Sequence, residues 1–314
     1  MTEAPQTGTP STTMVDDSVS GHVGWRAARE RELREPYGPL SPAALHWPTA
    51  KPQRLPGLPG EWWVAGGALY TQPAPGDTAV LTGEHVEPDG PTVIGVREGH
   101  GRILGTFVPE GRDTSGPADE REVAVEVVLR TGRYGVRPRD PRSATRAAFD
   151  GVPAFDYDPA WVLDVPVRWY EEPETVTVGG ARPGLVHHVE VLGEVDVVVG
   201  GQAATLALTG TLTAPVVVFS DEADGVAPWR TLQVTTPDGA DGADGAAEET
   251  AGEAAGLTED ESAGLVIATS DTLRLDLNRA TNLPYAFTDF GTSAAPLAGN
   301  HLPVAVTAGE KAPR

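Results

Sequence analysis

The sequence predicts a mainly β protein: an antiparallel β-sandwich or partly closed barrel with one N-terminal helix and a disordered acidic insert. Two observations carry this fold class. The 314 residues include 37 Gly and 29 Pro, a composition typical of many short strands joined by tight turns. From about residue 62 onward, short apolar runs recur with a period of two, so one face of each strand is expected to be buried and the other wet.

The helix is expected at residues 20–35. Ser20 can cap its first turn, Trp25 belongs to a short apolar face, and opposite charges pair across its turns. Residues 1–18 have low hydrophobicity and no period, which predicts a disordered tail.

Strands are expected in five early segments and in a later meander. The early segments are residues 62–64, 79–82, 92–96, 103–108 and 122–130. Residues 98–101 lie between two of these segments and predict a hairpin turn. The meander covers residues 185–208, where valines alternate with polar residues, and Gly200-Gly201 predicts a tight turn within it.

A single β domain is expected over residues 20–311. Residues 114–118 form the only plausible linker inside it, and they are few. Residues 237–263 interrupt the strand pattern with Asp-Gly-Ala repeats followed by Glu- and Ala-rich sequence. This composition predicts a disordered acidic loop between two strands. If those strands pair as a hairpin, deletion of the loop should leave the melting temperature nearly unchanged.

Charge and cysteine content exclude several classes of protein. The net charge of −22 repels phosphate backbones and anionic membranes, so neither nucleic acid nor a membrane is an expected partner. The chain has no cysteine, which excludes disulfides and thiolate catalysis. The common nucleotide-binding, hydrolase and metalloprotease motifs are absent, so no cofactor is expected. The N-terminus lacks signal-peptide features, which indicates a cytoplasmic protein.

His187 and His188 invite a metal-binding interpretation. Neighbouring residues on a strand point to opposite faces, however, so the two imidazoles cannot share one ion without a bulge. No metal site is expected there.

A series of motifs runs through residues 24–311. It comprises Trp25-Arg26, residues 40–47, Arg139-Asp140-Pro141 with Arg146, residues 149–155 and 158–161, residues 276–284, residues 300–303 and residues 308–311. In this order the motifs resemble the bacterial family catalogued as domain of unknown function 1684. No activity is established for that family, so the resemblance implies a kind of protein and not a reaction.

The chain departs from the family pattern in two places. The last block of the family usually carries two cysteines, whereas this chain has Tyr285 at the first position and no cysteine near Ser293. Residues 221–230 also differ from the family pattern, which weakens any ligand role for that loop.

The candidate ligand-binding residues are polar or aromatic and belong mostly to these motifs. They are His46, Trp47, Arg139, Asp140, Asp276, Asn278, Arg279 and Asn282.

The strongest group follows the last expected strand. Arg274, Asp276 and Asn278 are expected on one face of it, with Leu275 and Leu277 on the other. A binding site would use Arg279 as an anion clamp, Asn278 to orient the ligand and Asp276 as acceptor or general base. The structural alternative is an Arg–Asp pair, with asparagine side chains that satisfy the backbone of a turn.

Two further groups are weaker candidates. His46 with Trp47 suits a catalytic base or a ligand-stacking pair, or else a histidine that caps backbone groups. Arg139 and Asp140, ahead of Pro141, suit either an anion site or a strand exit with local pairing.

These features favour a soluble β protein that binds a small molecule, anionic if Arg279 contacts it. Two alternatives stay open. One is an enzyme with acid–base chemistry at the same pocket, where His46 or Asp276 is the base and Arg279 stabilises an oxyanion. The other is a non-catalytic interaction module whose acidic loop recruits a basic partner. A cavity shared by His46 and Arg279 would favour the first two functions, whereas positions at opposite ends of the fold would favour the interaction module. The sequence leaves the oligomeric state open.

Overall fold

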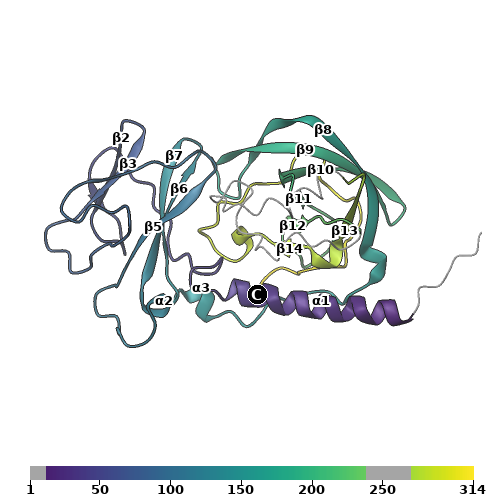
Figure 1. Ribbon diagram of the computed structural model, residues 1–314, viewed down its shortest axis with the longest axis horizontal. Coiled ribbons are helices and arrows are strands. Elements are labelled where there is room, and N and C mark those ends of the chain that lie inside the picture. Colours follow the sequence, from purple (N-terminus) through teal and green to yellow (C-terminus); the bar gives the residue numbers. More distant parts are fainter. Residues whose placement is uncertain (1–11, 238–269) are drawn as a thin grey trace, which may run out of the picture.

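The computed structural model describes residues 12–237 and 270–314, and within them the protein is mainly β, as the sequence predicts (Figure 1). The strands are β1 (Gln53–Arg54), β2 (Glu61–Ala65), β3 (Ala68–Gln72), β4 (Thr92–Ile94), β5 (Gly101–Phe107), β6 (Val123–Arg130), β7 (Arg133–Arg139), β8 (Val162–Gly179), β9 (Val186–Val199), β10 (Gln202–Thr211), β11 (Ala214–Phe219), β12 (Arg230–Gln233), β13 (Thr272–Asp276) and β14 (Thr281–Asn282). The α-helices are α1 (Thr12–Leu33), α2 (Ala118–Arg121) and α3 (Ala144–Ala147), and the 3-10 turns are η1 (Pro159–Trp161), η2 (Leu277–Arg279) and η3 (Pro284–Ala286).

The N-terminal lobe consists of two antiparallel sheets, at the left in Figure 1. Strands β1-β2-β3-β4 form one sheet and β5-β6-β7 the other. A single apolar cluster, which includes Trp62, Leu69 and Val127, takes its residues from both sheets. The two sheets therefore bury their apolar faces against one another, as in a sandwich.

Two local predictions in this lobe are wrong. The expected strand at residues 79–82 is reduced to a single bridge between Thr82 and Thr106. The expected hairpin around residues 98–101 does not form, because β4 pairs with β3 and β5 pairs with β6. The turn chemistry is present, but it connects two sheets and not two neighbouring strands.

The expected linker, residues 114–118, is not a boundary between units. It lies between β5 and β6, which pair along their length from Gly101↔Val128 to Phe107↔Val123. The single-domain expectation for residues 20–311 stays a prediction, since each lobe has a core of its own.

The C-terminal lobe is one seven-stranded antiparallel sheet in the order β13-β8-β9-β10-β11-β12-β14. The sheet curls over its own core (Figure 1). Just after β12, the last strand but one in this order, Thr235 forms a bridge with Arg274 of β13, the first strand. The lobe is thus a partly closed barrel. The predicted Gly200-Gly201 turn is confirmed, since Val199 pairs with Gln202 and both glycines have positive φ.

Helix α1 begins at Thr12, earlier than expected, so Ser20 lies inside it and does not cap it. Between Pro10 and Ser20 the sequence contains neither Pro nor Gly, and nothing stops the helix from extending upstream. Of the expected disordered tail, residues 1–11 lie outside the described residues. The helix runs along the C-terminal lobe beside β13 and β14 (Figure 1).

The expected acidic loop, residues 237–263, lies outside the described residues apart from Pro237. Its flanks are described, and the bridge between Thr235 and Arg274 brings them together. In the described parts of the chain, no helix has the length and apolar character needed to cross a membrane.

Candidate functional site

The candidate site begins where β13 ends. Leu273 and Leu275 are buried, while Arg274 faces outward and forms two 2.8 Å hydrogen bonds with Asp164 on β8. The expected alternation is therefore correct as far as Asp276. The chain then turns into η2, so Asn278 is buried and does not share the outer face of the strand.

Asp276 and Asn278 hold this turn together. The carboxylate of Asp276 accepts hydrogen bonds from the backbone N–H and the side-chain amide of Asn278, at 3.1 and 2.9 Å. The side-chain amide of Asn278 also bonds to Asp158: its oxygen accepts from the backbone N–H and its nitrogen donates to the carbonyl, each at 3.0 Å. The Asn278 amide is thus fully engaged in joining η2 to the turn before β8, which matches the structural alternative for this residue.

Arg279 has a different environment, because it is partly exposed and faces α1. Its Nε lies 3.4 Å from Oδ2 of Asp276, and its side chain keeps 36% of its surface exposed. The guanidinium carbon lies 5.8 Å from the ring centroid of Trp25, close enough for a cation–π contact.

His22 completes this cluster from the preceding turn of α1. It is buried, its ring stacks on Trp25 at 5.6 Å, and Tyr157 packs at a tilt 5.3 Å away. Burial lowers the pKa of His22, Arg26 and Arg279 add to this effect, and Asp276 opposes it. Its Nδ1 has no hydrogen-bond partner within the described residues. The site therefore contains a neutral imidazole beside a carboxylate.

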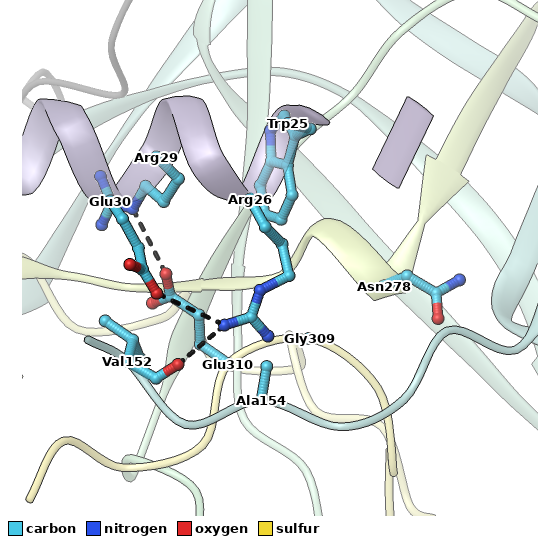
Figure 2. Close-up of a pocket in the computed structure, with 9 residues that line it drawn as sticks. All are labelled: Trp25, Arg26, Arg29, Glu30, Val152, Ala154, Asn278, Gly309 and Glu310. Atoms are coloured by element: carbon cyan, nitrogen blue, oxygen red, sulfur yellow. Dashed lines mark hydrogen bonds and ion pairs between the residues drawn. The ribbon is translucent and has the colours of Figure 1, made fainter. Parts of the chain in front are cut away.

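A small cavity of about 10 Å³ adjoins the cluster. Trp25, Arg26 and Asn278 line it, and Figure 2 shows Arg26 reaching from α1 across it toward Val152. Arg26 donates a 2.8 Å hydrogen bond to the Val152 carbonyl and lies 3.8 Å from Glu30. The volume admits about one water-sized group.

A buried ion pair closes the far end of this cavity. Arg29 Nε lies 3.3 Å from Oε1 of Glu310, and the backbone N–H of Asn282 donates to Oε2 at 2.6 Å. Burial raises the pKa of Glu310, against the attraction of Arg29. Gly309 has a φ of +74°, and a Cβ there would lie 2.5 Å from the Ala280 carbonyl. Only glycine lets the C-terminal segment approach this closely.

The α1 residues of this site were not among the ligand-binding residues predicted from the sequence. His22, Trp25, Arg26 and Arg29 follow the spacing i, i+3, i+4 and i+7, which places them on one face of a helix. Charged and aromatic residues on one face were the signal that could have found them.

The remaining candidates lie in the N-terminal lobe. His46 pairs with Val136 of β7, and its Nε2 lies 3.0 Å from the carbonyl oxygen of Pro56. The guanidinium of Arg133 stacks over Trp47 at 4.7 Å. Val136 belongs to the core of the N-terminal lobe, whereas Arg279 lies in the sequence between Leu277 and Ala280, both in the core of the other lobe. No contact found within the described residues joins His46 to Arg279.

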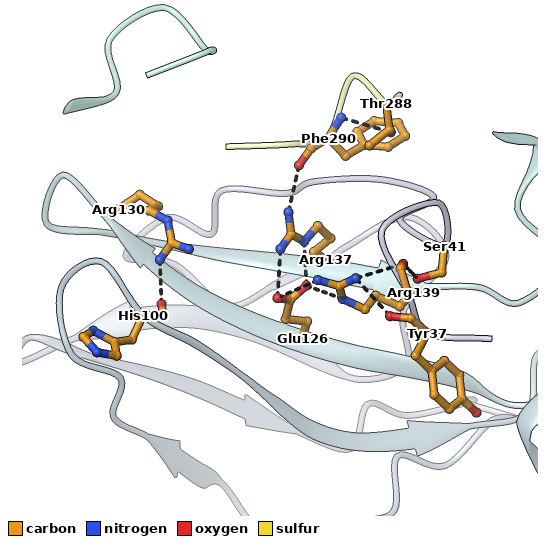
Figure 3. Close-up of polar contacts among 10 residues, drawn as sticks. Tyr37, Ser41, His100, Glu126, Arg130, Arg137, Arg139, Thr288 and Phe290 are labelled. Carbon is orange, nitrogen blue, oxygen red and sulfur yellow. Dashed lines mark hydrogen bonds and ion pairs between the residues drawn. The ribbon is translucent and has the colours of Figure 1, made fainter. Parts of the chain in front are cut away.

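Arg139 and Asp140 lie at the end of β7, each in an ion pair. Arg139 and Arg137 clasp the buried carboxylate of Glu126 from two sides, at 2.7 and 2.6 Å (Figure 3). Burial acts to raise the pKa of Glu126, but the two guanidinium groups outweigh it and hold that pKa well below its ordinary value. Asp140 accepts two hydrogen bonds from Arg112, at 2.8 and 2.6 Å. This is the strand exit with local pairing that the sequence allowed.

The two departures from the family pattern contact each other. Tyr285 stacks on Trp229 at 4.4 Å, and its hydroxyl bonds to both the N–H and the carbonyl of Trp229 at 2.9 and 2.8 Å. Burial raises the pKa of Tyr285 to about 12. The backbone N–H of Tyr285 lies 3.4 Å from Oγ of Ser293, so these two residues are neighbours in space.

The histidine pair on β9 faces two ways, as expected. His187 is buried, whereas His188 is exposed with its Nδ1 2.9 Å from the Thr177 hydroxyl. In the described residues, no three His, Cys, Asp or Glu side chains gather closely enough to hold a metal ion.

Comparison with known proteins identifies a family but no activity. A family model described as "Protein of unknown function (DUF1684)" matches residues 147–311. No curated protein matches the chain. Among solved structures, an uncharacterised protein from gene locus rrnAC0354 of Haloarcula marismortui is similar at 20% identity, over 53% of this chain and 78% of its own, with a TM-score of 0.36.

Proposed function

We propose that this chain, which belongs to the DUF1684 family of proteins of unknown function, binds a small anionic molecule between α1 and η2. The binding residues in this proposal are Arg26 and Arg279, with Trp25 as the wall between them. Asp276 positions Arg279, and Asn278 holds the turn that carries it.

The observation that carries the proposal is the unused donor capacity of two guanidinium groups beside one aromatic ring. Within the described residues, Arg26 makes one hydrogen bond, to Val152, and one 3.8 Å ion pair, with Glu30. The single ion pair of Arg279 there is the 3.4 Å contact with Asp276. A guanidinium has five N–H donors in a fixed fork, so most donors on both residues have no partner within the described residues. Carboxylate and phosphate groups match this fork.

The size and exposure of the site support a particular pose. The inner cavity of about 10 Å³ admits a single oxygen atom of the anion. The rest of the ligand would lie at Arg279, whose side chain is 36% exposed. The ligand class is therefore a small carboxylate or phosphate whose remainder extends toward solvent.

The first test is the native mass of freshly purified protein beside its denatured mass. An additional mass that is lost on denaturation would identify the ligand, and Arg279→Ala should remove it. Arg274→Ala is the matched control, because Arg274 lies on β13, the strand that leads into η2, and is paired with Asp164.

If the purified protein carries no ligand, acetate and inorganic phosphate serve as calorimetric probes. Loss of a charged hydrogen bond predicts binding at least tenfold weaker in Arg279→Ala. Equal binding by both variants would refute the proposal.

One observation favours a second candidate function, acid–base catalysis at the same site. The neutral imidazole of His22 has an unpartnered Nδ1 within the described residues and lies near Asp276, which suits a general base. In this version His22 replaces His46 as the base. A His22→Gln variant that still binds the ligand but no longer converts it would support catalysis. If the wild-type protein returns the ligand unchanged after long incubation, binding alone accounts for the site.

The interaction-module alternative stays a prediction, because the acidic loop at residues 237–263 lies outside the described residues apart from Pro237. The separation of His46 from Arg279 into different lobes supports this alternative.

A further inference from the structure

A second cavity lies in the N-terminal lobe, far in sequence from the site described above. Its volume is about 140 Å³, and it opens between β3, β4 and the segment that connects them. Its apolar lining consists chiefly of Pro59, Ala79, Val80, Leu81, Val86 and Pro88.

The polar groups in the wall of this cavity bind one another. Oδ2 of Asp77 accepts hydrogen bonds from the backbone N–H groups of Gly60 and Ala74, at 2.8 and 3.0 Å, and Oδ1 pairs with Arg54. Burial acts to raise the pKa of Asp77, but the bonds from Ala74, Arg54 and Gly60 outweigh it and lower that pKa. Both oxygens of the Asp77 carboxylate therefore already have hydrogen-bond partners, and the group needs none from a ligand.

The same holds for two other polar residues that line the cavity. The hydroxyl of Thr92 accepts the backbone N–H of Glu87 at 2.8 Å, and the amide of Gln72 donates to Glu61 at 3.2 Å. Apart from the exposed side chain of Glu87, the surface offered to an occupant is therefore mainly apolar. A polar ligand would lose its hydration without gaining partners.

The apolar floor is continuous with the core of the lobe. Ala79, Leu81 and Val86 pack against the cluster that contains Trp62 and Leu69. Val80 is 62% exposed, which places it at the opening. An occupant would thus bury its own apolar surface and the exposed part of this wall together.

The cavity is held open by anchors at both ends. On one side the backbone of Gly60 packs closely against that of Gln72, since a Cβ on Gly60 would be 2.5 Å from the Gln72 carbonyl. On the other side Thr82 exchanges two backbone hydrogen bonds with Thr106 of β5, at 2.9 and 2.8 Å. A preformed pocket binds without a large cost in ordering.

From this geometry we infer that the cavity is a binding site for a small apolar molecule of about the size of one aromatic ring. The volume of about 140 Å³ is comparable with the roughly 150 Å³ apolar cavity that holds benzene in a well-studied engineered protein. The proposal is independent of anion binding at Arg279, which lies in the other lobe.

The test uses the full chain with ¹³C-labelled methyl groups and toluene as the probe. Saturable shifts are expected at the methyl groups of Val80, Leu81 and Val86, with none at Leu206 or Leu208 in the other core. Acetate should produce no shifts at the three pocket residues. Shifts that rise linearly without saturation, or that spread over both lobes, would overturn the proposal.

Two substitutions fill the cavity. Val86→Phe should weaken toluene binding at least tenfold, and Ala79→Leu provides a second version if the first variant does not fold. Val93→Phe is the control, because Val93 is 59% exposed on β4 and does not line the cavity. Arg279→Ala should leave toluene binding unchanged, so the proposals for the anion site and for the apolar cavity can be refuted independently. Unchanged toluene binding in both filled variants would place the ligand elsewhere and refute the assignment.

Discussion

At the scale of single residues, buried arginines fasten the ends of the chain to the rest of the fold. Arg230 is fully buried and donates to three carbonyls of the C-terminal segment: Val306 at 3.2 Å, Ala308 at 2.6 Å and Glu310 at 3.1 Å. Its Nη2 also pairs with the buried carboxylate of Asp221 at 2.7 Å. One side chain thus holds in place the segment that carries Gly309 and Glu310.

Arg230→Ala should lower the free energy of unfolding by about 3–5 kcal/mol, because it leaves a buried carboxylate and several carbonyls without their partner. Arg274→Ala removes an ion pair whose side chains are 35% and 41% exposed, and should change stability by about 0–1 kcal/mol. Urea unfolding of both variants measures the difference. Similar losses in the two variants would contradict the assignment.

His22 predicts a pH dependence of stability. Its pKa in the folded protein is lowered by burial, so between that pKa and the ordinary value of about 6.5 the unfolded chain binds more protons. Stability should therefore fall as the pH decreases from about 6.5. An NMR titration of the His22 ring gives the folded pKa, and His22→Phe should flatten this part of the stability curve. A His22 ring that titrates above 6.5 would reverse the sign.

At the scale of elements, α1 is positioned by polar contacts more than by an apolar stripe. Among the helix residues whose side chains are described, Leu33 alone belongs to an apolar cluster, with Leu40 and Val152. One turn before it, Arg29 supplies a buried contact, through Glu310 and the carbonyl of Asn282 at 3.1 Å. This helix provides half of the candidate site, so its docking decides whether that site exists.

Arg29→Met should destabilise the docked helix, because it leaves Glu310 buried without its cation. Burial raises the pKa of Glu310 above its ordinary value of 4.5. Below the unfolded pKa, Glu310 is protonated in the folded protein and does not oppose folding. As the pH rises through the raised folded pKa, the folded state must hold a buried charge and loses stability. The variant should therefore be more destabilised at pH 8 than at pH 5.

Hydrogen exchange along α1 at the two pH values measures this effect. Arg31→Met is the control, since Arg31 is exposed on the same helix. The double variant Arg29→Met with Glu310→Gln should recover part of the loss. Faster exchange at pH 5 than at pH 8, corrected for intrinsic rates, would contradict the role given to Glu310.

At the scale of the whole molecule, two apolar cores are joined by a few polar contacts. Arg137 of β7 donates to the carbonyl of Phe290 at 3.1 Å (Figure 3). The Thr131 hydroxyl, in the turn after β6, bonds to both backbone groups of Val186 at 2.9 and 3.2 Å. Thr235 and Arg274 lie on the two sides of residues 238–269 in the sequence and form a bridge, so the described flanks of that segment are held together by the sheet.

Replacing residues 238–269 with a short Gly-Ser linker should leave the fold intact. Shortening a loop between paired flanks reduces the entropy cost of closing it, which predicts a gain of about 1 kcal/mol. Calorimetry compares the melting temperatures of the two chains. A large drop would mean that the segment packs on the lobe and would overturn its assignment as a spacer between strands.

From the sequence alone we predicted the β class, the Gly200-Gly201 turn, the outward Arg274 and inward Leu275, and the family. These depend on local rules: turn chemistry, and the period of two that sends neighbours to opposite faces of a strand. The start of α1 was predicted at Ser20 because serine is a common N-cap residue. No proline or glycine between residues 11 and 19 ends the helix there, so it extends back to Thr12. The hairpin at residues 98–101 was misassigned because turn residues do not specify which strands pair.

Which of the candidate residues meet depends on the three-dimensional fold. It separated His46 and Arg139 from Asp276 and Arg279, it buried Asn278 behind a turn, and it brought His22 and Arg26 of α1 to the end of β13. These contacts join segments more than a hundred residues apart, and no local pattern encodes them. The buried contact of Arg29 with Glu310 is one of them, and it ties α1 to the C-terminal segment.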